Sequence, residues 1–201
     1  MNISEAQRMM GIPAAYRGED FRIDQFDETI KGKWKFSIVP LIKDTVDERS
    51  GLALFSNRTN AGKTRLAIGW LTELLLTDLY EKKNLFHESL GMHTRNPNKY
   101  RFVDCRSNTI INAGGWKAED AVGNICYCAR GIVLDDIMQE RPSAVISYAQ
   151  VINHCFMHKV PLAMTMNATR EEFIDRYDMS IYRRYVENNR FIDVNEMRGW
   201  K

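Results

Sequence analysis

The chain of 201 residues lacks a long apolar run, because charged residues interrupt every hydrophobic stretch. We therefore expect no membrane-spanning segment and no membrane partner. The N-terminus, MNISEAQRMMG, has no apolar core of the kind that a secretory signal needs. Internal repeats and low-complexity stretches are also missing. These absences, together with the length, favour one compact domain that works in the cytoplasm.

Cysteine is scarce and is not arranged for zinc. The four cysteines are Cys105, Cys126, Cys128 and Cys155, and none belongs to a CxxC pair. We expect reduced thiols packed in a core rather than a metal site. An excess of charge is missing too, since the net charge is only +2. A nucleic-acid surface would have to be a local patch, and no helix-turn-helix or zinc-finger pattern is evident.

Short apolar runs alternate with helical patterns along the chain. Residues 51–56 read GLALFS, which is typical of a buried parallel strand. Residues 63–80 repeat large apolar side chains at helical spacing. Further strands are predicted at 100–105, 131–137, 161–166 and 190–194, and further helices at 37–47, 118–128, 143–158 and 171–188. This alternation predicts an α/β fold with a parallel sheet that helices cover on both faces.

The loop between the first strand and its helix fits a phosphate-binding pattern. It reads Asn57-Arg58-Thr59-Asn60-Ala61-Gly62-Lys63-Thr64, against G-x-x-x-x-G-K-[ST]. Backbone N–H groups at the start of the helix would face phosphate, while the lysine neutralises it and the threonine hydroxyl serves Mg²⁺. The sequence thus predicts an ATP and Mg²⁺ site, with nucleotide-binding residues Asn57, Asn60, Ala61, Gly62, Lys63, Thr64 and Arg65.

Asn57 departs from this pattern, because glycine is usual at the first position. We expect a backbone there that residues with a β-carbon avoid. Asparagine is the non-glycine residue that best tolerates left-handed geometry, so Asn57 is interpreted as a tolerated variant.

Two acids end the predicted strand at 131–137. Asp135 is expected to hold Mg²⁺, usually through water, and Asp136 to orient or deprotonate the attacking water. The second acid is commonly glutamate in such sites, so the shorter Asp136 predicts slow hydrolysis.

Polar residues follow the later elements. Asn167 comes directly after a predicted strand, where it could meet the γ-phosphate or cap the next helix, although Thr169 is another good cap. Arg183 and Arg184 lie near the end of the last long helix. Spacing alone favours a solvated basic face for these two arginines.

Taken together, these residues resemble the AAA+ ATPase domain of DnaC-type bacterial replicative helicase loaders and the related IstB-type transposition helpers. The resemblance covers most of the chain, from Gly11 to about Val194. It rests on the segment Gly11-Ile12-Pro13-Ala14-Ala15-Tyr16-Arg17 with Phe21 after it, the Gly62-Lys63-Thr64 loop, the strand ending at Asp136, the strand ending at Asn167, and the helix with Arg183 and Arg184.

The resemblance implies a three-layer P-loop NTPase (AAA+) fold without a separate lid domain. Residues 1–35 would form an N-terminal arm on the adenine side, and residues 36–201 the ATPase core. ATP would lie between subunits, with Tyr16 near the adenine and Asn167 at the first sensor position. Arg183 or Arg184 would act as the arginine finger. Too little sequence precedes Gly11 for a helicase-gripping domain, which favours a phage-encoded version in the cytoplasm of a bacterial host.

The implied function is an ATPase that acts in DNA replication, assembles with copies of itself, and engages a replicative helicase and single-stranded DNA. Two alternatives stay open: a transposition helper ATPase, and a nucleotide-binding adaptor that hydrolyses ATP poorly. Basic and aromatic side chains at Arg106, Trp116 and Lys117 are candidates for DNA contact, although an exposed loop with one buried tryptophan explains them as well. Residues 86–99 are a second candidate.

Overall fold

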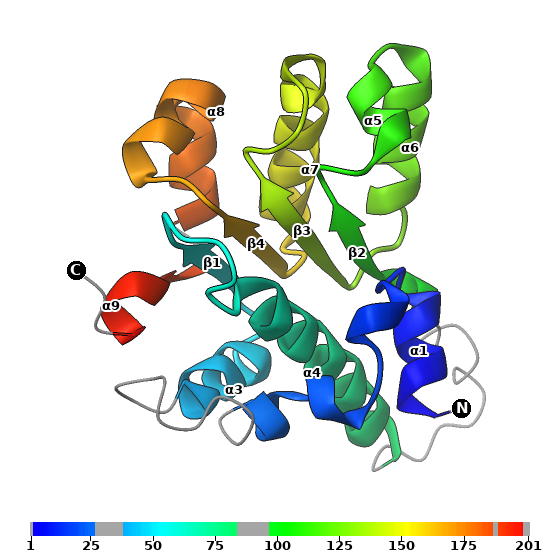
Figure 1. Ribbon diagram of the computed structural model, residues 1–201. Coiled ribbons are helices and arrows are strands. Elements are labelled where there is room, and N and C mark those ends of the chain that lie inside the picture. Colours follow the sequence, from blue (N-terminus) through cyan, green and yellow to red (C-terminus); the bar gives the residue numbers. More distant parts are fainter. Residues whose placement is uncertain (1, 27–37, 84–96, 187–188, 199–201) are drawn as a thin grey trace.

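The computed structural model describes residues 2–26, 38–83, 97–186 and 189–198. Five parallel strands form one sheet in the order β2-β3-β4-β1-β5, with helices on both faces (Figure 1). The strands are β1 (Gly51–Phe55), β2 (Tyr100–Asp104), β3 (Gly131–Ile137), β4 (Leu162–Met166) and β5 (Asn189–Asp193). The predicted three-layer α/β fold with a parallel sheet is therefore confirmed.

The helices agree with most of the predicted ranges. They are α1 (Ile3–Met9), α3 (Val39–Asp47), α4 (Lys63–Lys83), α5 (Thr109–Ala113), α6 (Trp116–Cys126), α7 (Val145–His158), α8 (Arg170–Val186) and α9 (Val194–Arg198). Proline stands in the first turn of α3, where its missing N–H costs no intrahelical bond. The structure adds α5 and α9, which the sequence did not predict. Past β5, the described residues form only α9 and no lid domain.

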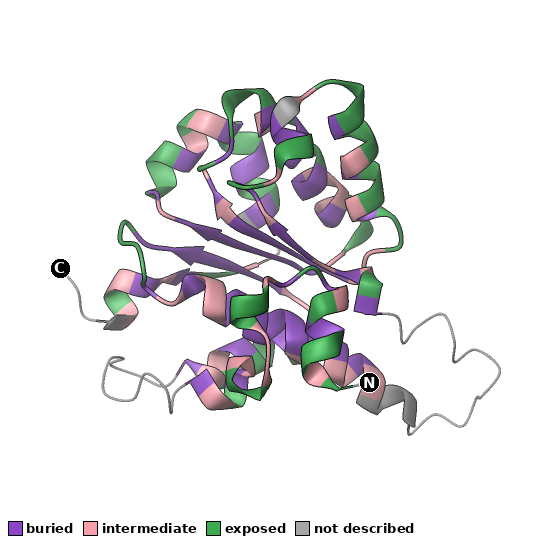
Figure 2. Ribbon diagram, turned by 45° about the vertical axis from the view of Figure 1, so that its right-hand side comes forward, coloured by how far each residue is buried: buried purple, intermediate pink, exposed green. Residues whose placement is uncertain are grey.

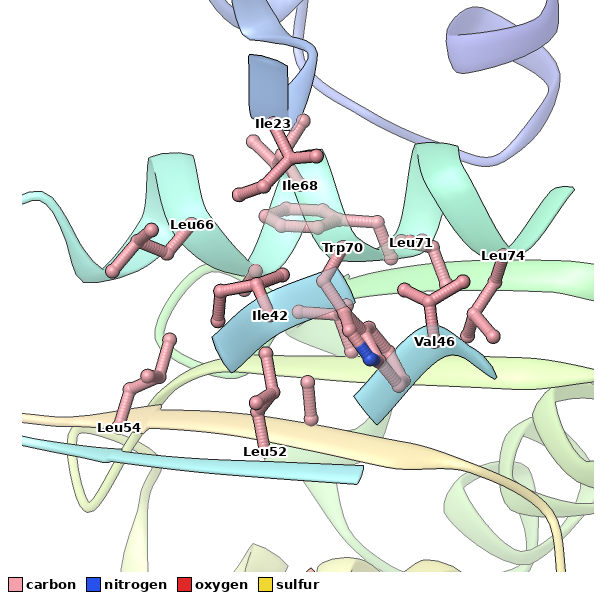
Figure 3. Packing of buried hydrophobic residues seen from close by; sticks show 14 of the residues in the cluster. Ile23, Ile42, Val46, Leu52, Leu54, Leu66, Ile68, Trp70, Leu71 and Leu74 are labelled. Atoms are coloured by element: carbon pink, nitrogen blue, oxygen red, sulfur yellow. The ribbon is translucent and has the colours of Figure 1, made fainter. Parts of the chain in front are cut away.

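One face of the sheet is covered by α4, α3 and the N-terminal segment. Trp70 and Leu71 of α4, Ile42 of α3 and Leu52 of β1 belong to one fully buried cluster (Figure 3). The other face is covered by α5, α6, α7 and α8. Apolar side chains are buried on both sides, so the strands are purple along most of their length in Figure 2. This double burial explains why β1, β3 and β4 are largely apolar runs in the sequence.

The described part of the N-terminal arm, residues 2–26, is folded into short helical turns. After α1 it forms three short 3₁₀ turns, Ala14–Tyr16, Glu19–Phe21 and Ile23–Gln25. Ile12, Ile23 and Phe26 are buried in the cluster beside α4. Polar contacts fix the turns, because the Gln7 side chain accepts a hydrogen bond from Gly18 N at 2.7 Å.

The cysteines follow the prediction in part. Cys105, Cys126 and Cys155 are buried thiols, but Cys128 is exposed. No helix among the described residues is long and apolar enough to cross a bilayer.

Parallel strands bring their carboxyl ends to one edge of the sheet. The loops that follow β1, β3 and β4 meet at this edge, since β4 lies between the other two strands. The predicted site residues of the three loops are therefore brought together by topology, although they are up to about a hundred positions apart.

Candidate functional site

Lys63 stands where the loop after β1 becomes α4, and its side chain is 5% exposed despite its charge. The Lys63 ammonium group donates a hydrogen bond to Arg58 O at 2.9 Å and another to Asn167 Oδ1 at 2.7 Å. The lysine is thus held over the loop by the loop's own carbonyl group and by the end of β4. A buried ammonium group that hydrogen bonds hold at a helix N-terminus is suited to binding an anion.

The loop is left-handed at Asn60 and Gly62, with φ of 55° and 91°. Asn57 does not have a positive φ, so the predicted reason for its tolerance is wrong. The strained position lies three residues further on, where an asparagine also stands. Asn57 is exposed and follows the buried Ser56, whose hydroxyl accepts a hydrogen bond from Arg58 N at 3.1 Å. A β-carbon at position 57 therefore causes no backbone strain.

Asp135 of β3 lies directly against the start of α4. Thr64 donates its hydroxyl hydrogen bond to Asp135 Oδ1 at 2.9 Å, and Thr165 of β4 donates to the same oxygen at 2.6 Å. Burial raises the pKa of Asp135 to about 6, the two threonines oppose the rise, and the nearby Asp136 and Asp104 carboxylates add to it. A buried carboxylate beside a hydroxyl group offers two oxygen ligands of the kind that Mg²⁺ accepts.

Asp136 has a left-handed backbone, with φ of 54°. Its N–H donates to Thr165 Oγ1 at 3.0 Å, and its carboxylate accepts a hydrogen bond from Asn167 Nδ2 at 3.3 Å. Asn167 therefore bridges Lys63 and Asp136 through the two ends of its amide.

The alternative role of Asn167, capping the next helix, is taken by Thr169. Thr169 Oγ1 accepts a hydrogen bond from Glu172 N at 3.2 Å, and Glu172 Oε2 accepts one from Thr169 N at 2.7 Å. This reciprocal capping box starts α8. The side chain of Asn167 is thereby left to the site.

The residues present fit a nucleotide with Mg²⁺. The left-handed loop leads into the N-terminus of α4, where the first backbone N–H groups have no partner within the helix. No group of three or more His, Cys, Asp or Glu side chains in the described ranges is placed to hold a metal by itself. One hydroxyl and one carboxylate suit a Mg²⁺ ion whose other ligands are phosphate oxygens and water.

Comparison with known proteins bears on the fold of the chain. No family model and no curated protein matches the sequence. Among solved structures, the DnaC helicase loader superposes with a TM-score of 0.51 and 20% identity, over 77% of this chain and 86% of that chain. A DNA replication initiation factor gives 0.55 and 11%, and AMPPCP-bound DnaA from Aquifex aeolicus gives 0.54 and 14%. Both of these superpositions cover 90% of this chain and 52% of the other.

The chain has the AAA+ fold. At these low identities the likeness concerns the fold, and the chain spans about half the length of the second and third structures. Within the AAA+ fold, the loop after β1, the acids of β3 and the residue after β4 surround one point at the carboxyl edge of the sheet.

Tyr16 and Arg65, the other two predicted nucleotide-binding residues, both contact Phe21. The Arg65 guanidinium group lies over the Phe21 ring at 5.1 Å and donates a hydrogen bond to Asp20 O. Tyr16, 39% exposed, packs edge-to-face on Phe21 with ring centroids 5.7 Å apart. The structure thus joins Tyr16 and Arg65 to each other through Phe21, and not to Lys63.

Arg183 and Arg184 are exposed at the end of α8 that leads into β5. Arg184 donates a hydrogen bond to Asn153 of α7. It also lines a cavity of about 690 Å³ together with Gly51 and Leu162, the first residues of β1 and β4. These two arginines therefore lie at the amino edge of the sheet, opposite Lys63, and cannot serve the site of their own chain.

Two residues of the site were not predicted. Thr165 is fully buried and links both acids of β3, and its signal was a hydroxyl in the apolar strand LAMTM. Asp104 ends β2 and pairs in register with Asp135, and its signal was an acid at a strand end.

The predicted DNA-contacting residues are exposed at the carboxyl edge of the sheet, the edge at which Lys63 and Asp135 lie. Trp116, 69% exposed, begins α6 after two glycines with φ of 71°, and the Lys117 ammonium group lies 5.5 Å from its ring centroid. The tryptophan is not buried, which removes the alternative given for it. Arg106 is exposed after β2. Of residues 86–99, only Pro97–Lys99 is described, as a 3₁₀ turn before β2.

Proposed function

We propose that this chain binds ATP with Mg²⁺ at the carboxyl edge of its sheet and hydrolyses the ATP slowly. The observation that carries the proposal is the convergence of three loops on Lys63. Its ammonium group contacts Asn167, and the next residue, Thr64, contacts Asp135. A lysine and a hydroxyl at the start of α4, a buried carboxylate of β3 and an amide after β4 form a set that phosphoryl transfer uses.

Each side chain has a distinct task in this proposal. Lys63 neutralises the outer phosphates, while Thr64 and Asp135 hold Mg²⁺, which screens charge on the phosphates when it is bound. Asp136 accepts a proton from the attacking water, and Asn167 orients it, because the two side chains are already hydrogen-bonded. Asn57, Asn60, Ala61 and Gly62 supply the loop backbone.

The wider proposal is a helicase-loader-like AAA+ protein that acts in DNA replication. Its support is the fold shared with the DnaC helicase loader and with AMPPCP-bound DnaA, AMPPCP being an ATP analogue. The position of Arg183 and Arg184, opposite Lys63, suits an assembly in which one subunit's arginine reaches a neighbour's ATP. A replicative helicase and single-stranded DNA are the proposed partners, in the cytoplasm of a bacterial host. In this assembly residues 2–26 would lie on the adenine side.

Turnover by the Asp136→Asn variant tests the hydrolytic role. We expect its kcat to fall by about tenfold or more with unchanged nucleotide affinity, because a general base contributes on the order of 100-fold or more. Asp120→Asn, an exposed acid on α6, is the matched control. Equal rates for Asp136→Asn and wild type would remove Asp136 as the base.

The alternative of a nucleotide-binding adaptor that hydrolyses ATP poorly predicts a different outcome. Tight ATP binding by the wild type without turnover, even with single-stranded DNA and a helicase present, would favour this adaptor. Binding to a purified transposase rather than to a purified replicative helicase would favour the transposition helper.

A further inference from the structure

The loop after β3 contains a buried carboxylate, that of Glu140, which lies beyond the end of the strand. Glu140 has a fully buried side chain, and its Oε2 accepts a hydrogen bond from Met138 N at 2.5 Å. Its Oε1 accepts one from Arg176 Nε of α8 at 2.6 Å. Arg176 also donates from Nη2 to the Glu140 carbonyl oxygen at 2.7 Å. Arg176 therefore donates hydrogen bonds to both the side chain and the backbone of Glu140.

These hydrogen bonds lie where the backbone of the loop is strained. Asp136 and Met138 both have left-handed backbones, with φ of 54° and 83°. Non-glycine residues keep such conformations only where surrounding contacts over-determine them. Glu140 supplies one of these contacts by binding Met138 N from inside the turn. Asn112 holds the far end of the loop, because its Oδ1 accepts a hydrogen bond from Arg141 N at 3.2 Å.

The same turn fixes the backbone of Asp136. The Asp136 carbonyl oxygen accepts a hydrogen bond from Gln139 N at 3.1 Å, within the turn that Glu140 closes. The direction of the Asp136 carboxylate toward Asn167 depends on this backbone conformation. Removing the partner of a buried carboxylate leaves an unpaired charge, so the turn would rearrange without Arg176.

Arg176 also joins this turn to a particular part of α8. The helix is broken at Asp178, with φ of 69° and ψ of 165°, and the Asp178 side chain caps the second half by accepting from Ser180 N at 2.6 Å. Arg176 lies in the last turn of the first half, and Arg183 and Arg184 lie on the second half.

We propose that Arg176 and Glu140 are a positioning pair, which holds Asp136 in its hydrolytic orientation and ties it to the helix that bears Arg183 and Arg184. The inference rests on the proposed ATP hydrolysis, and the pair itself touches neither nucleotide nor Mg²⁺. The chain thus couples its own hydrolytic turn to the helix that faces a neighbouring subunit.

Kinetics on two variants test the pair. Arg176→Gln and Glu140→Gln are expected to lower kcat by about tenfold or more, while the Kd of a fluorescent ATP analogue changes by less than about twofold. Arg176→Lys keeps the charge but loses the two-pronged contact, so its kcat is expected between those of Arg176→Gln and wild type. The double variant is expected to be no slower than Arg176→Gln alone, since Arg176→Gln already removes both contacts with Glu140. Asp175→Asn, an exposed neighbour on α8, is the control.

Wild-type kcat in both single variants, or parallel losses of kcat and affinity, would overturn the proposal. Amide hydrogen exchange on the nucleotide-free protein keeps this test separate from the proposed function. Residues 136–141 are expected to exchange faster in Arg176→Gln, with no change at residues 63–68. Unchanged exchange at residues 136–141 would contradict the positioning role of Arg176 and Glu140, whether or not the wild type hydrolyses ATP. Absence of ATP hydrolysis in the wild type would by itself reject only the proposed function.

Discussion

At the scale of single residues, Asp135 is the most constrained group of the site. Its carboxylate is 6% exposed and accepts hydrogen bonds from Thr64 and Thr165, yet burial still raises its pKa to about 6. The ionised form is therefore held in the fold at a cost in stability. A bound cation would offset this cost, which ties the stability of the site to its ligand.

Asp135→Asn should stabilise the metal-free protein at pH 7.5. A carboxyl group whose pKa rises on folding favours the folded state at low pH, and this contribution is lost as the pH rises through about 6. The gain at pH 7.5 should reach up to about 3 kcal/mol. It should shrink at pH 5, where the wild type is protonated.

Thermal unfolding in EDTA at the two pH values measures the effect, with the exposed Asp120→Asn as control. A change in Tm that is the same at pH 5 and pH 7.5 would contradict the assignment.

Most residues of the candidate site could be predicted from single positions along the sequence. Lys63, Asp135 and Asn167 each stand at a strand end or at the start of a helix, and parallel topology brings such positions together. Asn57 was misjudged because the pattern does not say which loop residue is left-handed. Arg176 was missed because nothing local marks which of many arginines meets a buried glutamate.

At the scale of elements, α6 presents its first turn to solvent. Trp116 and Lys117 stand there side by side, a basic and an aromatic group on an exposed helix end. Tyr127, 75% exposed, follows the other end of the same helix. The two aromatic residues differ in position and not in exposure, so they form a matched pair.

Trp116→Ala should weaken binding of single-stranded DNA at least about fivefold, because stacking of one base contributes about 1–3 kcal/mol. Tyr127→Ala should leave the affinity unchanged. Fluorescence anisotropy with a labelled oligonucleotide at fixed salt measures both. Equal losses in the two variants, or no loss in either, would remove the first turn of α6 from the DNA interface.

Elements were predictable where burial dictates the pattern, and not where distant contacts decide it. The central strands β1, β3 and β4 are largely apolar because both faces of the sheet are covered there. The turns after α1 depend on long-range contacts, such as Gln7 with Gly18 and Thr72, which no local spacing reveals. The break in α8 at Asp178 is hidden within an ordinary helical pattern.

At the scale of the whole molecule, the sheet separates the two groups of predicted site residues. Lys63 follows the carboxyl end of β1, whereas Arg184 lies beside the first residue of the same strand. A strand of five residues spans roughly 16 Å, so the two groups lie well apart. The alternation of strands and helices was sufficient to predict the parallel α/β sheet, whereas the AAA+ fold was implied by the family resemblance.

Nucleotide binding to the purified chain tests the central claim most directly. Titration of a fluorescent ATP analogue should show saturable binding that weakens when EDTA removes Mg²⁺. Lys63→Ala should weaken it at least about tenfold, because a charge-assisted contact contributes about 1.5–3 kcal/mol. Lys43→Ala, an exposed lysine on α3, should bind as the wild type does. Absence of binding to the wild type, or equal affinity in Lys63→Ala, would contradict a nucleotide site at the carboxyl edge of the sheet.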